Sequence, residues 1–174
     1  MTDWSFLTNI FLFHNLDETQ AATVRGMLHE RTFRAQEKII EEGFAGESLF
    51  IIVSGRVQIY RTFDNEKFVL TELAAYDFFG EMSLIDDFAA SATVETLTEV
   101  TVLEMTRSDF KSLVSSGPEI SARLWESLAR SLNSKIRNTG NLVKMYYGLN
   151  KALCEDKEFR ELYTAWNFDS PQRR

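Results

Sequence analysis

The sequence predicts an α+β chain in which a β-sandwich or barrel lies between short N-terminal helices and one long C-terminal helix. Three observations lead to this prediction. Apolar residues follow a helical spacing before residue 31 and after residue 105, but alternate in short runs between them. Turn signals, including Glu42-Gly43 and Asp64-Asn65, separate those short runs. No proline stands between Pro118 and Pro171, so a long helix can run through this part of the chain.

Length and composition restrict the classes of protein to consider. A chain of 174 residues, 44% of them hydrophobic, is long enough for one buried core and short for two ordinary domains. Its net charge of −7 argues against generic nucleic-acid binding. A single cysteine excludes an internal disulfide and a cysteine-based zinc site, and two histidines leave little for a histidine-based one. No apolar stretch approaches the ~20 residues that span a bilayer, and the first residues lack a signal-peptide pattern, so we expect a cytoplasmic protein.

The first 30 residues predict two short helices. Asp3 is expected to cap a helix from about Trp4 to Asn9. Asp17 and Gln20 form a capping-box pattern for a second helix, from Glu18 to His29.

Short strands are expected over residues 31–105, where β-branched and aromatic residues alternate with polar ones. Thr106 with Asp109 then caps a short helix over residues 106–116. Pro118 opens a long helix to about Leu153, since proline is tolerated in the first helical turn. The clearest strand-like runs are Ser48–Ser54, Gly55–Arg61, Phe68–Leu73 and Glu99–Glu104. We therefore expect a domain over residues 1–117, a long helix over 118–153 and a tail over 154–174.

The long helix differs from the preceding residues in charge and in pattern. Residues 1–117 carry a net charge of −10, residues 118–151 a net +4 and residues 152–174 a net −1. Steps of three and four residues along the helix define a heptad seam, which is typical of a coiled coil. At ~1.5 Å per residue the helix spans roughly 54 Å, more than a small domain, so we expect a homodimer formed by the seam. The alternative is a helix packed entirely on its own domain. The seam residues are Trp125, Leu128, Leu132, Lys135, Thr139, Leu142, Tyr146, Leu149 and Leu153.

A second apolar stripe on the long helix is expected to face the β-domain, at Ile120, Leu124, Ala129 and Ile136. Residues 154–174 predict one short helix, which needs a docking surface because an isolated helix of this length is marginal in water. We expect it to dock on the partner subunit; the alternative is the mouth of its own barrel. The apolar positions around this tail are Leu153, Phe159, Leu162, Tyr163 and Trp166.

Several spaced motifs resemble the cyclic nucleotide-binding superfamily. The segment from Phe79 to Val94, Phe-Gly-Glu-Met-Ser-Leu-Ile-Asp-Asp-Phe-Ala-Ala-Ser-Ala-Thr-Val, is similar to the phosphate-binding cassette of that family. Ile39–Gly43 and Ser48–Gly55 match its glycine-bearing strands, and Pro118 to Leu142 resembles the dimerisation helix of Crp/Fnr-like activators. The resemblance covers about residues 5–145. It implies an antiparallel jelly-roll β-barrel with N-terminal helices and a long C-terminal helix.

The resemblance also assigns candidate ligand contacts to this cassette. A cyclic phosphate needs backbone N–H donors, which a glycine lets approach, and a cation, normally a forked arginine. Gly80 matches the first role, Glu81 the carboxylate that accepts from the ribose 2′-hydroxyl, and Ser91 the serine beside the arginine. An alternative is that Glu81 only anchors its own loop. The candidate site residues are Phe79, Gly80, Glu81, Met82, Ser83, Ala90, Ser91, Ala92 and Thr93.

The arginine of this pattern is absent. Ala90 stands at its position, and no Lys or Arg occurs between Lys67 and Arg107. Loss of a buried charge pair of this kind costs ~2–5 kcal/mol, which weakens binding roughly 30- to 3,000-fold. Lys135 and Ile136 stand where the family presents small hydroxyl residues to the base, and Lys135 is either a replacement cation or a solvated or interfacial side chain. The sequence therefore predicts a pocket that is degenerate for cyclic nucleotides.

These observations together predict a stand-alone, non-enzymatic regulatory module without catalytic residues or a metal, in which a cyclic nucleotide binds weakly or not at all. One alternative is a cyclic AMP or cyclic GMP sensor that recruits another cation. A second is a scaffold that binds a protein partner. A transcription factor is disfavoured, because residues 152–174 are too few for a helix-turn-helix reader. We expect neither DNA nor a membrane as a partner.

Overall fold

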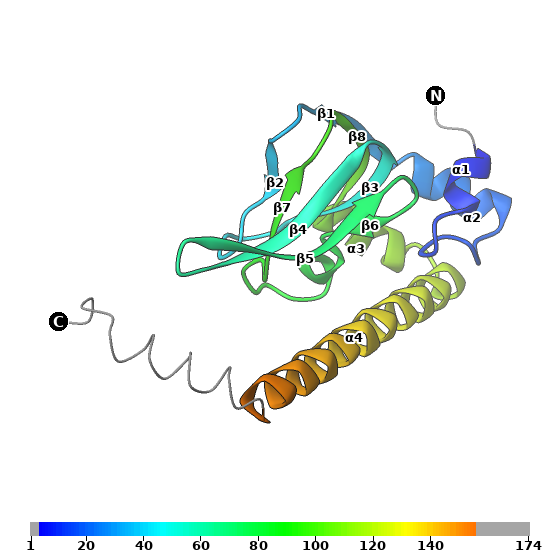
Figure 1. Cartoon of the computed structure of the whole chain (residues 1–174). Coiled ribbons are helices and arrows are strands. Elements are labelled where there is room, and N and C mark those ends of the chain that lie inside the picture. Colours follow the sequence, from blue (N-terminus) through cyan, green and yellow to red (C-terminus); the bar gives the residue numbers. More distant parts are fainter. Residues whose placement is uncertain (1–3, 156–174) are drawn as a thin grey trace. The chain divides into compact units, whose positions relative to one another are not determined.

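The computed structural model describes residues 4–155 of the chain (Figure 1). The expected cap Asp3 and residues 156–174 of the expected tail helix lie outside the described residues. Helices and strands follow one another in the order α1 Trp4–Thr8, α2 Glu18–Arg25, β1 His29–Phe33, β2 Lys38–Ile40, β3 Ser48–Ser54, β4 Arg56–Phe63, β5 Glu66–Ala74, β6 Phe78–Phe79, the 3₁₀ helix η1 Glu81–Leu84, β7 Thr93–Thr96, β8 Val100–Thr106, α3 Arg107–Ser115 and α4 Pro118–Glu155.

Two four-stranded sheets form the β-domain. One has the strand order β1-β8-β3-β6 and the other β2-β7-β4-β5, and their pairings are antiparallel (Figure 1). Strands that are far apart in the sequence lie side by side: His29 pairs with Glu104, and Phe50 with Phe79. The predicted α+β class, with an antiparallel jelly roll between helices, is confirmed.

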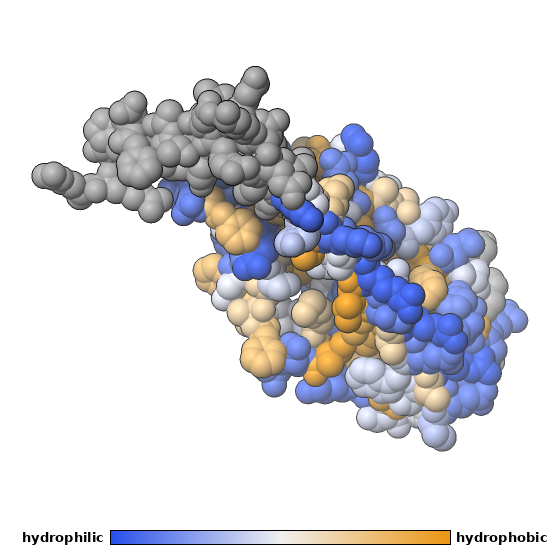
Figure 2. All heavy atoms as spheres, turned by 60° about the horizontal axis from the view of Figure 1, so that its bottom comes forward, coloured by the Kyte–Doolittle hydropathy of each residue, from blue (hydrophilic) through white to orange (hydrophobic). Residues whose placement is uncertain are grey.

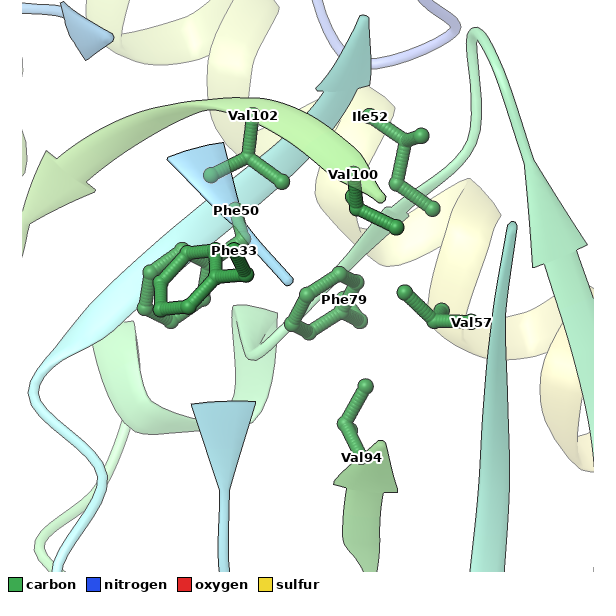
Figure 3. Packing of buried hydrophobic residues seen from close by; sticks show 8 residues of the cluster. All are labelled: Phe33, Phe50, Ile52, Val57, Phe79, Val94, Val100 and Val102. Atoms are coloured by element: carbon green, nitrogen blue, oxygen red, sulfur yellow. The ribbon is translucent and has the colours of Figure 1, made fainter. Parts of the chain in front are cut away.

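A cluster of aromatic and β-branched residues fills the space between the sheets (Figure 3). The rings of Phe50 and Phe79 are stacked with their centroids 5.2 Å apart. Val94 of β7 and Val57 of β4 point toward these rings from the other sheet (Figure 3). Burial of such side chains contributes about 1.5–3 kcal/mol each, so this cluster holds the sheets together. Its members are Phe33, Phe50, Ile52, Val57, Phe79, Val94, Val100 and Val102.

The N-terminal helices follow the predicted capping chemistry but end earlier. The Asp17 carboxylate accepts from the Gln20 N–H at 2.9 Å, and the Gln20 side chain accepts from the Asp17 N–H at 3.2 Å. The prediction that α2 extends to His29 is wrong: α2 ends at Arg25, and His29 begins β1. Pairing of β1 with β8 supplies backbone hydrogen bonds that a longer helix would have excluded, which is a tertiary effect.

Helix α4 has a buried face in its first part. Ile120, Leu124 and Leu128 are buried, whereas Ala129 is exposed, which contradicts the expectation that it continues the buried stripe. The position expected for Ile136 stays a prediction, because this residue belongs to the second of the two compact units described below. Leu128 was expected in the dimer seam but packs within its own chain, because the turns of α4 bring it onto the same face as Leu124.

Ser127 of α4 is also fully buried, and its hydroxyl has no hydrogen-bond partner within the described part of the chain. The chain divides into two compact units, Met1–Ala129 and Arg130–Arg174, and the division falls inside α4. The boundary expected at Gly117 stays a prediction.

Candidate functional site

The cassette segment, residues 79–94, begins where strand β6 delivers Gly80 into a left-handed turn. Gly80 has φ 82°, a conformation that side chains disfavour. A Cβ atom there would lie 2.4 Å from the carbonyl oxygen of Ser48, closer than packing allows. The turn and the close approach to β3 therefore both require glycine at this position.

The 3₁₀ helix η1 follows this glycine and carries three of the candidate residues. Glu81 is only 4% exposed, and Ser83 is buried as well, whereas Met82 is exposed. The backbone N–H of Ser83 donates to the carbonyl oxygen of Gly80 at 3.1 Å, which closes the turn. Glu81 is therefore held inside the domain by a short helix.

The second half of the cassette segment pairs with the loop that joins β2 to β3. Ala90 donates from its N–H to the carbonyl oxygen of Phe44 at 2.8 Å and accepts from the N–H of Gly43 at 2.9 Å. Ala45 and Ala89 form a β-bridge beside this pair, and the Thr93 hydroxyl accepts from the N–H of Glu42 at 3.1 Å. Ala92 and Thr93 are buried and Ser91 is exposed. Backbone pairing thus fixes the stretch that contains Ala90.

Arg107 is a residue near the cassette segment that sequence reasoning did not assign to the site. Its Nη2 donates to the carbonyl oxygens of Asp86 at 2.8 Å and Gly46 at 3.0 Å, its Nε donates to the carbonyl oxygen of Ser83, and its Nη1 pairs with the Asp87 carboxylate. The side chain is 20% exposed. These contacts span at least 20 positions of sequence, so the local pattern around Arg107 carried no signal for them. Arg107 therefore links the cassette segment, through Ser83 and Asp86, to the β2–β3 loop at Gly46.

Other cations near these loops are also paired with carboxylates. Arg61 Nε lies 2.9 Å from the Glu42 carboxylate, and Lys38 Nζ lies 2.6 Å from that of Glu41. Hydrogen bonding to Glu41 raises the pKa of Lys38. An anion at the cassette would compete with these carboxylates for the same cations.

Glu95 is the centre of a polar cluster on the β2-β7-β4-β5 sheet. Its carboxylate accepts from Lys67 Nζ at 2.9 Å, from Gln58 Nε2 at 2.9 Å and from the Tyr60 hydroxyl at 3.2 Å. Burial acts to raise the pKa of Glu95, but the hydrogen bonds from Lys67 and Gln58 outweigh it and the net pKa is lowered. The cluster stabilises an ionised carboxylate at neutral pH.

Apolar side chains also reach the surface around the cassette segment. Phe44 is 65% and Phe88 80% exposed, on the two sides of the bridge between Ala45 and Ala89. The face of the molecule drawn in Figure 2 carries apolar residues next to strongly hydrophilic ones. Asp86 and Asp87 follow η1, and the Asp87 side chain is exposed.

The heptad seam expected on α4 is described only in part. The Trp125 ring packs edge-to-face against that of Phe110 with centroids 5.5 Å apart and remains partly exposed. The Thr139 hydroxyl donates to the carbonyl oxygen of Lys135 at 2.9 Å. Leu132 and Lys135 are partly exposed. The side chains of the remaining seam residues lie outside the described ones: Leu142, Tyr146, Leu149 and Leu153.

Comparison with known proteins identifies the family of this fold. The family model for the cyclic nucleotide-binding domain matches residues 30–116, half of the chain. The chain belongs to the cyclic nucleotide-binding domain family. This match contains the whole cassette segment and both sheets except His29, the first residue of β1.

Curated relatives with a cyclic nucleotide-binding domain include regulators and channels. The chain is 32% identical over 133 residues to a CRP-like cAMP-activated global transcriptional regulator of Mycobacterium tuberculosis, covering 76% of this chain and 59% of that one. It is 37% identical over 118 residues to a cyclic nucleotide-gated potassium channel of Rhizobium etli, covering 68% and 32%. The chain thus spans less than two thirds of either relative.

A solved structure supports the same assignment. The N-terminal domain of a transcriptional regulator from Streptomyces coelicolor is similar with a TM-score of 0.68 and 28% identity, covering 77% of this chain and 94% of that one. Among the described residues, no helix is long and apolar enough to cross a membrane.

Proposed function

We propose that this chain is a non-enzymatic regulatory module whose cyclic nucleotide-binding domain has lost tight binding of cyclic nucleotides. The observation that carries the proposal is Ala90, which stands in the stretch where the family places its phosphate-binding arginine. Family membership and CRP-like relatives support the regulatory role. The remaining candidate contacts are Phe79, Gly80, Glu81, Met82, Ser83, Ser91, Ala92 and Thr93.

The surroundings of Ala90 support weak binding. A phosphate buried without a cation loses about 2–5 kcal/mol relative to one that is paired with arginine. Arg107 is the cation that follows the cassette segment, and it already donates to three carbonyl oxygens and one carboxylate. Moving it to a ligand would leave buried carbonyl groups unpaired, at a further cost of about 1–3 kcal/mol each.

Titration calorimetry with cyclic AMP and cyclic GMP tests this proposal. A micromolar site weakened roughly 30- to 3,000-fold binds in the range from tens of micromolar to millimolar. We expect no saturable heat at low micromolar ligand. Low-micromolar binding would favour the second candidate, a cyclic nucleotide sensor that uses another cation.

We further propose a cytoplasmic homodimer formed by α4. The exposed apolar residues Ile136, Val143, Met145 and Tyr147 support an interface on its later turns, because such side chains are favourable on a helix when a partner covers them. Analytical ultracentrifugation is expected to give a dimer at micromolar concentration. Truncation after Asn150 is expected to weaken it, whereas an unchanged dimer constant would place the tail elsewhere and a monomeric full chain would overturn the dimer.

A protein-interaction scaffold is the third candidate. It is favoured by the exposed rings of Phe44 and Phe88. Absence of binding to any cyclic nucleotide, together with a stable dimer, is the combination that this candidate requires.

A further inference from the structure

Two loops beside the 3₁₀ helix η1 form one continuous surface. Arg107 Nη2 donates to the carbonyl oxygens of both Gly46 and Asp86, at 3.0 and 2.8 Å. A Cβ atom on Gly46 would overlap the Ser83 hydroxyl, so one loop packs directly on the other. Side chains from both loops therefore reach the same part of the surface. The loops are residues 43–47, between β2 and β3, and residues 82–88 of the cassette segment.

Large apolar side chains are exposed on both loops, with exposed fractions between 46% and 80%. Phe44 and Phe88 each directly precede a member of the antiparallel bridge between the loops, so their side chains are diagonal neighbours on one face. Single exposed apolar side chains are ordinary, but several on adjoining loops are typical of an interaction surface. The residues of this surface, which we call the loop patch, are Phe44, Met82, Ile85 and Phe88.

The same two loops are acidic. Residues 41–48 and 81–91 contain six Asp or Glu and no Lys or Arg. Cations from other segments form ion pairs with Glu41, Glu42 and Asp87. The negative charge that these cations leave over belongs to the carboxylates nearest the loop patch.

Two carboxylates lie beside the loop patch without an ion pair within residues 4–155. They are Glu47, which is exposed, and Asp86, which is partly exposed. The N–H of Phe88 donates to the Asp86 carboxylate at 3.2 Å, which holds this charge next to the ring. A Lys or Arg side chain is the group that binds such carboxylates most strongly. The loop patch thus combines apolar surface with an acidic edge.

This combination selects the chemistry of a partner. Nucleic acids and anionic lipids present phosphates, which the carboxylates of Glu47 and Asp86 repel. A second copy of the chain that presented the same patch would bring like charges together. A protein segment that carries both large apolar side chains and Lys or Arg would cover the rings and compensate the carboxylates.

We propose that the loop patch docks a partner protein through a cationic amphipathic segment. Apolar side chains of that segment cover Phe44 and Phe88, and its Lys or Arg side chains meet Glu47 and Asp86. The proposal deepens the scaffold candidate, on which it rests, by naming the surface and the chemistry of the partner. Because three of the four patch residues belong to the cassette segment, the docked partner contacts the element that relatives use for their ligand.

A synthetic amphipathic helix made of leucine and lysine is the probe, because it carries only these two chemistries. In NMR titration of the full chain we expect saturable shifts of the Phe44 and Phe88 backbone amides, with a dissociation constant below about 100 μM. A matched probe has glutamate in place of every lysine. It is expected to bind at least about tenfold more weakly, because its charges face Glu47 and Asp86.

A pair of ring variants tests the location. Phe88→Ser is expected to weaken binding of the leucine–lysine probe by about tenfold or more, since it removes an aromatic anchor. Phe63→Ser is the matched control, because this ring is 52% exposed on β4, outside the loop patch. The control should bind within about twofold of the unmodified chain. Thermal unfolding checks that both variants are folded.

A pair of charge variants separates the acidic edge from the general charge of the chain. Glu47→Lys and Glu66→Lys change the net charge equally, and both residues are exposed. Glu47→Lys is expected to weaken binding about threefold more than Glu66→Lys, because only Glu47 lies beside the loop patch.

Four results would overturn the proposal: no saturable binding of the leucine–lysine probe, equal binding of the two probes, equal losses in the two ring variants, or equal losses in the two charge variants. Cosedimentation with phosphatidylglycerol vesicles in place of peptide binding would assign the patch to lipid and overturn it as well. Failure of the scaffold candidate is a separate result, because it appears as low-micromolar binding of cyclic AMP in calorimetry.

Discussion

The amide nitrogen of Ala90 lies 2.8 Å from the carbonyl oxygen of Phe44, to which it donates a hydrogen bond. The stretch around Ala90 is therefore positioned by its backbone, and its side chain takes no part in that hydrogen bond. A residue with a different side chain can occupy this position while the pairing with the β2–β3 loop stays intact.

Replacement of Ala90 by arginine is expected to restore affinity for cyclic AMP. The forked guanidinium supplies the missing cation for the phosphate, so the dissociation constant in calorimetry should fall by a decade or more. Ser91→Arg is a matched control, because it adds the same charge at the adjacent exposed position. Equal gains in both variants would show a general charge effect, and no gain in Ala90→Arg would mean that further parts of the pocket have diverged.

Arg107→Lys is expected to lower the free energy of unfolding by about 2–4 kcal/mol, because lysine cannot reproduce the planar set of donors that meets Ser83, Asp86 and Gly46. Urea unfolding measures this loss. Arg31→Lys is the control: Arg31 pairs with Glu104 and lies over the Phe33 ring, but its side chain is half exposed and lysine keeps the charge, so the change should stay within about 1 kcal/mol. Equal losses of unfolding free energy in the two variants would contradict the conclusion that Arg107 holds the cassette segment in place.

Glu95→Gln is expected to destabilise the domain by about 1–2 kcal/mol at pH 7 and to flatten its acid sensitivity. The pKa of Glu95 is lowered in the folded state, so its contribution is fully present above the pKa of an unfolded glutamate, about 4.3, and is lost as the pH falls through the lower folded value. Urea unfolding between pH 7 and pH 3 should show the two proteins converge at the acid end. Glu66→Gln at the start of β5 is the exposed control. A constant difference across this range would contradict the assignment.

Tyr76→Gly is expected to be more stable than Tyr76→Ala by about 1 kcal/mol. Tyr76 has φ 75°, in the left-handed region that glycine tolerates, and its ring lies 5.0 Å from that of Phe6 in α1. Both substitutions remove the ring contact, but only glycine removes the backbone strain. Thermal unfolding measures the difference, and Phe6→Ala reports the ring contact by itself. If the alanine and glycine variants unfold at the same temperature, the backbone at residue 76 is not strained.

The sequence predicted those parts of the fold that depend on local pattern. The Asp17–Gln20 capping box and the strand Ser48–Ser54 were found because their signals lie within a few residues. The turn from α2 into β1 was missed, since His29 joins a strand only by pairing with Glu104 across the chain. For the same reason the exposure of Ala129 did not follow from helical spacing alone.

The candidate site likewise has some features that the sequence predicted and others that it did not. Gly80 was identified from its motif, and the structure supplies the physical reason in its approach to Ser48. The contacts of Arg107 with Ser83 and Asp86 arise from segments that meet only in the folded chain. The spacing of residues along the sequence does not encode contacts between distant segments, so these contacts could not be predicted from it.

The unpartnered hydroxyl of Ser127 has a consequence for how the protein opens. A buried hydroxyl without a partner costs about 1–3 kcal/mol, and this cost disappears once water reaches the group. Separation of the first turns of α4 from their neighbours is therefore easier, by about that amount, than it would be with alanine at this position. Amides around Ser127 should exchange their hydrogens sooner than those of β3 and β8, which are central strands of a sheet. Ser127 thus lowers the free energy needed to separate the first turns of α4 from their neighbours while the strands of the two sheets stay paired.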